Sequence, residues 1–383
     1  MIRLLTFSTL FPNSVQPNHG IFVENRLRHL VGTGEATSRV LAPVPWFAFR
    51  HAPVPAREER NGLVAEHPRY LAIPVAGMSV GPALLYLAAR QALARMVAEG
   101  FEFDAIDAHY LYPDGVAAVW LGRHFGRPVV LTARGSDVTQ WPDHAVPRRL
   151  IQGALRRADA LIGVSAALCR RMVELGAAQD KVTTLRNGVE TQLFRPVDRQ
   201  AARAALGLAR PTLVSVGLLI PRKGHDRTIA AMAELPDHEL IILGEGPERG
   251  RLEAQIAALG LGGRVRLLGA RPHAELPQYY GAADAMILAS SREGWANVLL
   301  ESMACGTPVV ASNIPGNPEV VAAPEAGLVI DENTPAGIAR GVRRLFANLP
   351  ARTATRAYAE RFGWDETSAG QLDIFRRVTA GKA

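Results

Sequence analysis

Two glutamates around a predicted helix start form the most informative chemical pattern in the chain. Glu293 lies in a loop after the apolar run 285–289, and Glu301 lies about one turn inside the helix that follows. The run is typical of a buried parallel strand, and nucleotides bind at the carboxyl ends of such strands. Glu301 could accept hydrogen bonds from ribose hydroxyls. The backbone N–H groups that could face a pyrophosphate belong to Gly294, Trp295, Ala296 and Asn297. The pattern indicates a nucleotide site, although an amphipathic helix with two solvated glutamates is the simpler interpretation.

A glycine turn and two cations in the second half could bind a diphosphate. Gly217 follows the apolar run 212–216, and Arg222 and Lys223 precede a glycine at the start of the next predicted helix. Helix-start N–H groups and cations together form a cradle for phosphate oxygens. Two cations matter because a departing diphosphate gains negative charge in the transition state, where fixed donors stabilise it most. The chain has three lysines beside 40 arginines, so Lys223 is an uncommon choice and a candidate functional residue.

Polar residues at predicted strand ends of the first half could meet a sugar or an acceptor. Gly20 opens a helix and would let the backbone approach a phosphate or sugar, although His19-Gly20 could equally be an ordinary turn. His109 ends a predicted strand, where a functional and a structural role are both open. Arg134 could hold a charged acceptor or the sugar, and we expect Asp137 to brace the same loop.

The loop at 243–250 resembles a dinucleotide-binding fingerprint but does not match it. Its third glycine comes one residue late. The acidic residue expected about 20 residues further on is also missing, since Arg264 and Arg266 lie there instead. This spacing argues against an NAD enzyme.

Short apolar runs alternate with helical stretches, which predicts an α/β protein with parallel sheets. The predicted strands cover residues 2–8, 38–42, 105–110, 129–132, 161–164, 183–186, 212–216, 239–243, 265–268, 285–289, 309–311 and 327–330. The series restarts after a hinge at 194–198, and 383 residues exceed one ordinary domain. We therefore predict two Rossmann-like, doubly wound domains, residues 1–195 and 196–362, that face each other across a cleft.

A series of short segments between residues 17 and 321 resembles, in order, the motifs of one enzyme family. The segments lie at 17–24, 107–110, 131–138, 187–190, 216–226, 243–250, 271–273, 291–311 and 315–321. The family is the group of retaining glycosyltransferases of the GT-B fold called the glycogen-synthase-like "family four" group, or glycosyl transferases group 1. The resemblance covers nearly the whole chain. It implies that the C-terminal helix, residues 363–383, crosses back and packs on the first domain.

This resemblance implies transfer of a sugar from a UDP- or GDP-sugar donor, with retention, to a glycan or lipid-linked acceptor. The implied context is bacterial polysaccharide or glycolipid assembly. Such enzymes need no catalytic divalent ion, and the chain carries no Asp-x-Asp metal signature. We therefore expect no metal and no resident cofactor, the nucleotide sugar being a substrate. Lys223 and Arg222 would neutralise the leaving diphosphate, and same-face attack by the acceptor, with the donor phosphate assisting its deprotonation, is the implied route.

Roles for individual residues also follow from the resemblance. Glu293 would lie near the sugar hydroxyls and the anomeric carbon, His109 would contact the donor sugar, and Glu301 would hold the ribose. The implied donor-side residues also include Gly20, Gly217, Lys223, Gly246, Arg271, Gly294, Trp295, Ala296 and Asn297, and the acceptor-side residues are His19, Arg134 and Asp137. Two positions depart from the family pattern. Leu218 stands where the family normally has an arginine, for which Arg222 could substitute, and Arg134 stands where a histidine is common.

Two other functions fit parts of this pattern. A sugar-nucleotide epimerase of the same fold would need acid–base carboxylates, for which the first half offers Asp107, Asp114 and Asp137. A catalytically inactive sugar-nucleotide-binding scaffold is favoured by Leu218 and Arg134.

The charge of the chain is uneven. Residues 1–200 hold 23 Lys+Arg against 17 Asp+Glu, and the remainder holds 20 against 19, which accounts for the net charge of +7. The basic half could meet an anionic membrane, to which an aromatic, proline-rich loop at 43–55 and a basic helix at 147–157 could contribute. No recognised motif supports nucleic-acid binding. Two distant cysteines and no apolar run of about 18 residues predict a cytoplasmic protein, or a peripheral one at the inner face of the membrane.

Overall fold

The computed structural model describes residues 1–46, 54–73 and 77–380, which form two compact units. Unit 1 comprises residues 1–187 and 364–383, and unit 2 comprises residues 188–363. Most of the loop predicted at 43–55 lies outside the described residues. Across the described ranges, no helix is both long and apolar enough to cross a membrane.

Residues 188–195 belong to unit 2 rather than to the first domain in which the sequence analysis placed them. The N–H of Val189 donates to the Phe362 carbonyl oxygen at 2.9 Å. The ring of Phe194 is buried and lies 4.9 Å from the ring of His273 and 6.1 Å from that of Tyr280. These contacts fasten the connecting segment to unit 2 before the first helix of that unit begins.

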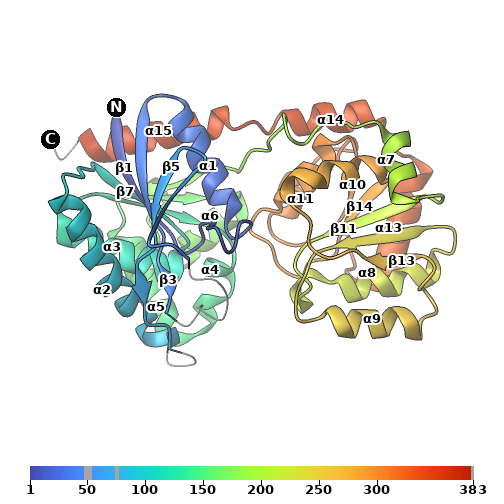
Figure 1. Ribbon diagram of the computed structural model, residues 1–383, viewed down its shortest axis with the longest axis horizontal. Coiled ribbons are helices and arrows are strands. Elements are labelled where there is room, and N and C mark those ends of the chain that lie inside the picture. The colour runs from blue at the N-terminus through green and yellow to red at the C-terminus, as the bar shows by residue number, and fades with distance from the viewer. Residues whose placement is uncertain (47–53, 74–76, 381–383) are drawn as a thin grey trace. The chain divides into compact units, whose positions relative to one another are not determined.

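Unit 1 is built on an eight-stranded sheet of order β10-β9-β8-β7-β1-β2-β5-β4 (Figure 1). Its strands are β1 (Ile2–Phe7), β2 (Ala36–Leu41), β4 (Arg57–Arg60), β5 (Leu63–Glu66), β7 (Ala105–His109), β8 (Val129–Ala133), β9 (Ala160–Gly163) and β10 (Val182–Thr184). All neighbours are parallel except β4 and β5, which form an antiparallel hairpin. Two short strands, β3 (Val44–Pro45) and β6 (Arg69–Tyr70), pair separately.

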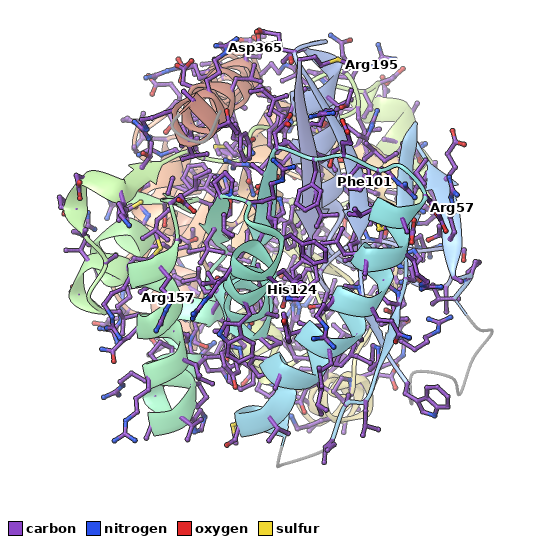
Figure 2. The ribbon with its side chains drawn as sticks, turned by 90° about the vertical axis from the view of Figure 1, so that its left-hand side faces the viewer. Arg57, Phe101, His124, Arg157, Arg195 and Asp365 are labelled. Atoms are coloured by element: carbon purple, nitrogen blue, oxygen red, sulfur yellow. The ribbon has the colours of Figure 1, made fainter. Side chains whose placement is uncertain are left out.

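Helices cover both faces of this sheet (Figure 1). One face packs against α1 (Ile21–Gly32) and α15 (Asp365–Ala380) around a core that includes Leu4, Leu30 and Phe375. The other face carries α2 (Gly77–Ala98), α3 (Val116–Phe125) and α5 (Ala145–Arg157), which contact one another as one layer. Figure 2 shows the three helices of this layer. Shorter helices are α4 (Ser136–Thr139) and α6 (Ala166–Glu174).

Unit 2 contains a six-stranded parallel sheet of order β13-β12-β11-β14-β15-β16. Its strands are β11 (Thr212–Val216), β12 (Glu239–Leu243), β13 (Val265–Leu267), β14 (Ala285–Leu288), β15 (Val309–Ser312) and β16 (Gly327–Ile330). One face is covered by α8 (His225–Ala231), α9 (Arg249–Ala258) and α13 (Pro335–Ala347), whose apolar side chains share one core with the strands. The remaining helices are α7 (Arg199–Leu206), α10 (Leu276–Ala282), α11 (Asn297–Ala304), α12 (Asn317–Val320) and α14 (Arg352–Glu360). The predicted α/β class with doubly wound parallel sheets is therefore confirmed.

Candidate functional site

The strand order of unit 2 reverses direction between β11 and β14, and this places two distant loops side by side. Ligands of open α/β sheets bind outside the carboxyl ends of strands at such a switch point. The loop after β11 carries Arg222 and Lys223 on a single 3-10 turn, η4 (Pro221–Lys223), and the loop after β14 carries Glu293. The Lys223 Nζ donates to Glu293 Oε1 at 2.7 Å, and Arg222 Nη1 lies 3.7 Å from Glu293 Oε2. Arg222 Nη1 also donates to the Arg292 carbonyl oxygen at 3.0 Å.

This cluster carries more positive than negative charge. Burial alone would raise the pKa of Glu293, but the charge of Lys223, its hydrogen bond and the charge of Arg222 outweigh burial and lower that pKa below its usual range. Glu293 is therefore an ionised carboxylate held between two cations. One positive charge remains in excess, which suits an anionic ligand.

Close packing between two loops explains the glycine at position 246. A Cβ built on Gly246 would come within 2.4 Å of the Leu219 carbonyl oxygen. In the same place the Leu219 N–H donates to the Glu245 carbonyl oxygen at 2.9 Å. The glycine thus lets the loop after β12 rest on the loop that holds Lys223. Leu218, at the position where the family normally has an arginine, is 58% exposed.

A second carboxylate of unit 2 has both oxygens in hydrogen bonds. Glu301 lies in α11, where Oε1 is 3.2 Å from His273 Nε2 and Oε2 accepts from the Tyr280 hydroxyl at 3.1 Å. Burial alone would lower the pKa of His273, but the hydrogen bond and charge of Glu301 raise that pKa above its ordinary value. Burial and Glu301 also raise the pKa of Tyr280 well above its ordinary value, so its hydroxyl stays protonated. The two donors fix the orientation of the carboxylate.

The other predicted donor-side residues of unit 2 lie in two segments, the turn before α11 and the loop after β13. Gly294, Trp295 and Ala296 are buried in the turn before α11, and Asn297 begins that helix. Arg271 lies between β13 and the 3-10 turn η6 (His273–Glu275), and its Nε is buried without a hydrogen-bond partner among the described residues. In the described ranges, no group of three or more His, Cys, Asp or Glu side chains is arranged to hold a metal ion.

In unit 1 the predicted His109 is the centre of a buried polar network. Its ring is 1% exposed; Nε2–H donates to Asp107 Oδ2 at 3.2 Å, and Nδ1 accepts from Arg134 Nη2 at 2.7 Å. Burial lowers the pKa of His109 to about 4, so the imidazole is neutral at pH 7. Both ring nitrogens are engaged inside unit 1. Arg134, which replaces the histidine common in the family, therefore fixes the tautomer of His109.

A second arginine, which is fully buried, supports this network. Arg26 is 1% exposed and donates to Gln371 Oε1 at 3.0 Å, to the Leu185 carbonyl oxygen at 3.0 Å and to Asn187 Oδ1 at 3.3 Å. Arg134 Nη1 donates to the same Asn187 oxygen at 3.0 Å. Burial lowers the pKa of Arg134 to about 9 and that of Arg26 to about 10, so both stay protonated at pH 7. Arg26 was not predicted from the sequence; its signal is an arginine among the apolar positions of α1.

The remaining unit 1 candidates hold the loops around this network. Asp137 accepts from the N–H groups of Leu111, Arg134 and Gly135, so its carboxylate braces the loop. His19 is exposed, and its Nε2 lies 3.1 Å from the Thr9 carbonyl oxygen. Gly20 has a φ of 71°, and a Cβ there would come within 2.3 Å of the Leu10 backbone.

Both halves of the chain match known glycosyltransferase families. Residues 198–362 match the family described as glycosyl transferases group 1, and residues 38–193 match Glycosyltransferase Family 4. The chain is 29% identical to D-inositol 3-phosphate glycosyltransferase 1 of Catenulispora acidiphila, over 99% of this chain and 96% of that protein. It is 34% identical to D-inositol 3-phosphate glycosyltransferase of Acidothermus cellulolyticus, over 73% of this chain and 68% of that protein.

Solved structures show the same fold. Sucrose-phosphate synthase from Thermosynechococcus elongatus matches with a TM-score of 0.82 and 22% identity, over 100% of both chains. HepE of Anabaena, solved in complex with UDP-glucose, matches with a TM-score of 0.74 and 20% identity, over 100% of this chain and 99% of that one. The likeness over whole chains, together with the sequence relatives, confirms the resemblance found in the motifs. The chain belongs to the group 1, family 4 glycosyltransferases of the GT-B fold.

Proposed function

We propose that the protein transfers a sugar from a nucleotide diphosphate-sugar with retention of configuration and without a catalytic metal ion. The observation that carries this proposal is the pair of cations, Lys223 and Arg222, on the ionised Glu293 at the switch point of unit 2. Fixed positive groups of this kind can neutralise a leaving diphosphate, the task that a divalent cation performs in other enzymes.

In the proposed reaction, the bond between the anomeric carbon and the diphosphate oxygen breaks, and a bond to an acceptor hydroxyl oxygen forms on the same face. The acceptor proton passes to the departing diphosphate, so that charge and atoms balance. Lys223 and Arg222 stabilise the diphosphate as its charge grows. Glu293 holds both cations in place and faces the sugar hydroxyls, while Glu301 accepts hydrogen bonds from the ribose.

The donor is proposed to be a UDP-sugar. Support comes from HepE of Anabaena, whose structures were solved with UDP and with UDP-glucose and share the fold along nearly the whole chain. GDP- and ADP-sugars are the alternatives for the test.

Two acceptor classes have support from different observations. The names of the sequence relatives favour inositol 3-phosphate or a similar small phosphorylated polyol. Arg134, a half-buried cation beside His109, is a group in unit 1 that suits such an anion. A glycan or lipid-linked acceptor, which the motifs alone suggested, is favoured instead by the basic helices of unit 1 described below.

The hydrogen bonds of the unit 1 carboxylates argue against the alternative epimerase function. Asp107 is bonded to His109, Asp137 accepts three backbone N–H groups, and Asp114 accepts the N–H and hydroxyl of Thr9. All three are buried and bonded within the fold. An inactive scaffold remains the alternative, because Leu218 and Arg134 depart from the family pattern.

The test is a transfer assay with UDP-, GDP- and ADP-sugars against an acceptor panel containing inositol 3-phosphate, sugar phosphates and a polyprenyl-linked sugar. Proton NMR of the product reports the anomeric configuration. We expect an α-linked product from an α-linked donor, at the same rate in EDTA and in Mg²⁺. Inverted product or a requirement for the metal would contradict the proposed mechanism, and donor binding without transfer to any acceptor would favour the scaffold.

A further inference from the structure

The helices α2, α3 and α5 form a layer without a single acidic residue. Together they span 22, 10 and 13 residues, and their sequences contain neither Asp nor Glu. The basic residues on them are Arg90, Arg95, Arg123, His124, Arg148, Arg149, Arg156 and Arg157. We call the exposed surface that these eight side chains form the arginine face.

This layer accounts for the positive charge of the first half of the chain. Residues 1–200 hold 23 Lys+Arg against 17 Asp+Glu, and without the seven arginines of this face 16 would remain against 17. The rest of that half is therefore close to neutral. The charge is concentrated on one side of unit 1 rather than spread as a general property of an arginine-rich protein.

All eight side chains are exposed, and within the described part of the chain none of the seven arginines forms an ion pair with a carboxylate. Their recorded contacts are with carbonyl oxygens or rings: Arg148 with Pro142, Arg157 with Gly153, and Arg90 with the Tyr86 ring. On α13 of unit 2, by comparison, Arg340 and Arg343 pair with Glu332 and Glu234.

Apolar side chains are interleaved with these arginines. Leu87 and Val97 of α2 are 49% and 42% exposed, and Val146 of α5 is 42% exposed. Leu87 lines a groove of about 680 Å³ together with Arg90, Arg95 and His124. A second, smaller groove, about 130 Å³, lies between α3 and α5 and is lined by Trp120, Leu150, Arg149, Arg156 and Arg157. Figure 2 shows the three helices side by side on this face, with His124 and Arg157 labelled on it.

We propose that the arginine face binds the surface of an anionic lipid bilayer. Unpaired arginines attract anionic headgroups, and their long stems together with Leu87, Val97 and Val146 suit the apolar boundary beneath those headgroups. A surface built from three adjacent helices presents several charges at once, as a flat lipid surface requires. Nucleic acid is the less favoured partner, because the face contains no recognised nucleic-acid motif and no row of exposed aromatic rings between its basic residues.

The experiment measures co-sedimentation of the full chain with vesicles of phosphatidylcholine alone and of phosphatidylcholine with phosphatidylglycerol in equal parts. The test variant carries Arg149→Gln, Arg156→Gln and Arg157→Gln on α5. The matched control carries Arg340→Gln, Arg343→Gln and Arg344→Gln on α13, a helix of the same 13-residue length in unit 2 that loses the same charge. Melting temperatures of both variants check that each is folded.

We expect the wild type and the α13 variant to bind the anionic vesicles in a salt-dependent manner and to ignore pure phosphatidylcholine. The α5 variant should bind at least about tenfold more weakly, since each basic residue near an anionic surface contributes appreciably. Three results would overturn the proposal: no binding of the wild type at low salt, equal weakening by both variants, or binding to an RNA oligonucleotide but not to vesicles. None of these outcomes depends on glycosyl transfer, so the lipid surface and the proposed reaction can fail separately.

Discussion

The amine of Lys223 lies 2.7 Å from the carboxylate of Glu293, although the two residues are 70 positions apart in the chain. The topology of unit 2 brings them together, because β11 and β14 are neighbours at the point where the strand order reverses. The ion pair has side chains that are 14% and 10% exposed, so water screens it only partly. A ligand diphosphate that enters this site would compete with Glu293 for the same cations.

Lys223→Ala should reduce transfer severely without unfolding the protein. The remaining cation, Arg222, lies farther from Glu293, and the departing diphosphate would lose one of the two proposed fixed charges. We expect kcat to fall by about 10²–10³-fold, with the variant still folded at the assay temperature. Near-normal turnover in steady-state kinetics would rule out the proposed phosphate site.

Arg222→Ala tests whether this residue replaces the arginine missing at Leu218. We expect a fall in kcat of about tenfold or more, because the exposed position 218 carries no charge of its own. Adding Leu218→Arg to the Arg222→Ala variant should restore part of the loss. The single Leu218→Arg variant is the control, and a double variant no faster than Arg222→Ala would show that the two positions are not equivalent.

Glu301→Gln should raise the Kd of the donor nucleotide more than it lowers kcat at saturating donor. The amide keeps one acceptor oxygen but loses the charge that Tyr280 and His273 orient. Isothermal titration should give a Kd for the nucleotide diphosphate raised by roughly tenfold, while kcat at saturating donor changes little. An unchanged Kd would count against the ribose contact.

His273→Gln should destabilise the protein in a pH-dependent way. Glu301 raises the folded-state pKa of His273, and the charge of Glu190 raises it further. The neutral Tyr280 hydroxyl donates to the other carboxylate oxygen of Glu301. A raised histidine pKa stabilises the fold fully below its ordinary value of about 6.5, and the stabilisation disappears as pH rises through the folded-state value. The difference in melting temperature between wild type and variant should therefore shrink on going from acid to alkaline pH. When both proteins also carry Glu301→Gln, the difference in melting temperature should no longer depend on pH. If the difference between the wild type and His273→Gln is itself independent of pH, the ion pair of His273 with Glu301 is contradicted.

Asp114→Asn should stabilise the protein increasingly as pH rises from about 4 to about 7. Burial raises the pKa of Asp114 from 3.8 to about 7, and its hydrogen bonds with Thr9 lower it only in part. Between these values the folded state keeps a proton that the unfolded state has lost, so the free energy of unfolding falls with rising pH. The asparagine variant has no proton to lose here, so its free energy of unfolding does not fall in this way. The difference in the free energy of unfolding between the variant and the wild type should level off above pH 7 at no more than about 4 kcal/mol. Parallel stability curves for the two proteins would show that Asp114 does not titrate in this range.

The positions of most strands along the chain could be predicted from apolar runs, and each of the twelve predicted strands is present. The hairpin of β4 and β5 was missed because the edge strand β4 (Arg57–Arg60) consists entirely of charged residues and the apolar run in β5 (Leu63–Glu66) is only three residues long. Its signal was the Asn61-Gly62 turn, where both residues have positive φ. Local turn chemistry would have found what hydrophobicity could not.

Site residues that directly follow a predicted strand could be predicted from the sequence. Contacts between residues that are distant in the chain could not. The loop positions of Lys223 and Glu293 and the strand-end position of His109 follow from the apolar run before each one. Arg26 and Gln371 are 345 positions apart, and their hydrogen bond depends on α15 packing against α1. A single sequence contains no local signal for such a pair, so the buried network of unit 1 required the structure.

Binding of nucleoside diphosphates in the absence of metal tests the central claim most directly. The measurement is a thermal-shift titration of the full chain with UDP, GDP and ADP in EDTA, with Lys223→Ala beside the wild type. We predict that one diphosphate, UDP first, raises the melting temperature of the wild type in chelator and that Lys223→Ala loses most of that shift. A shift that appears only when Mg²⁺ is added, or one that Lys223→Ala retains in full, would contradict the account.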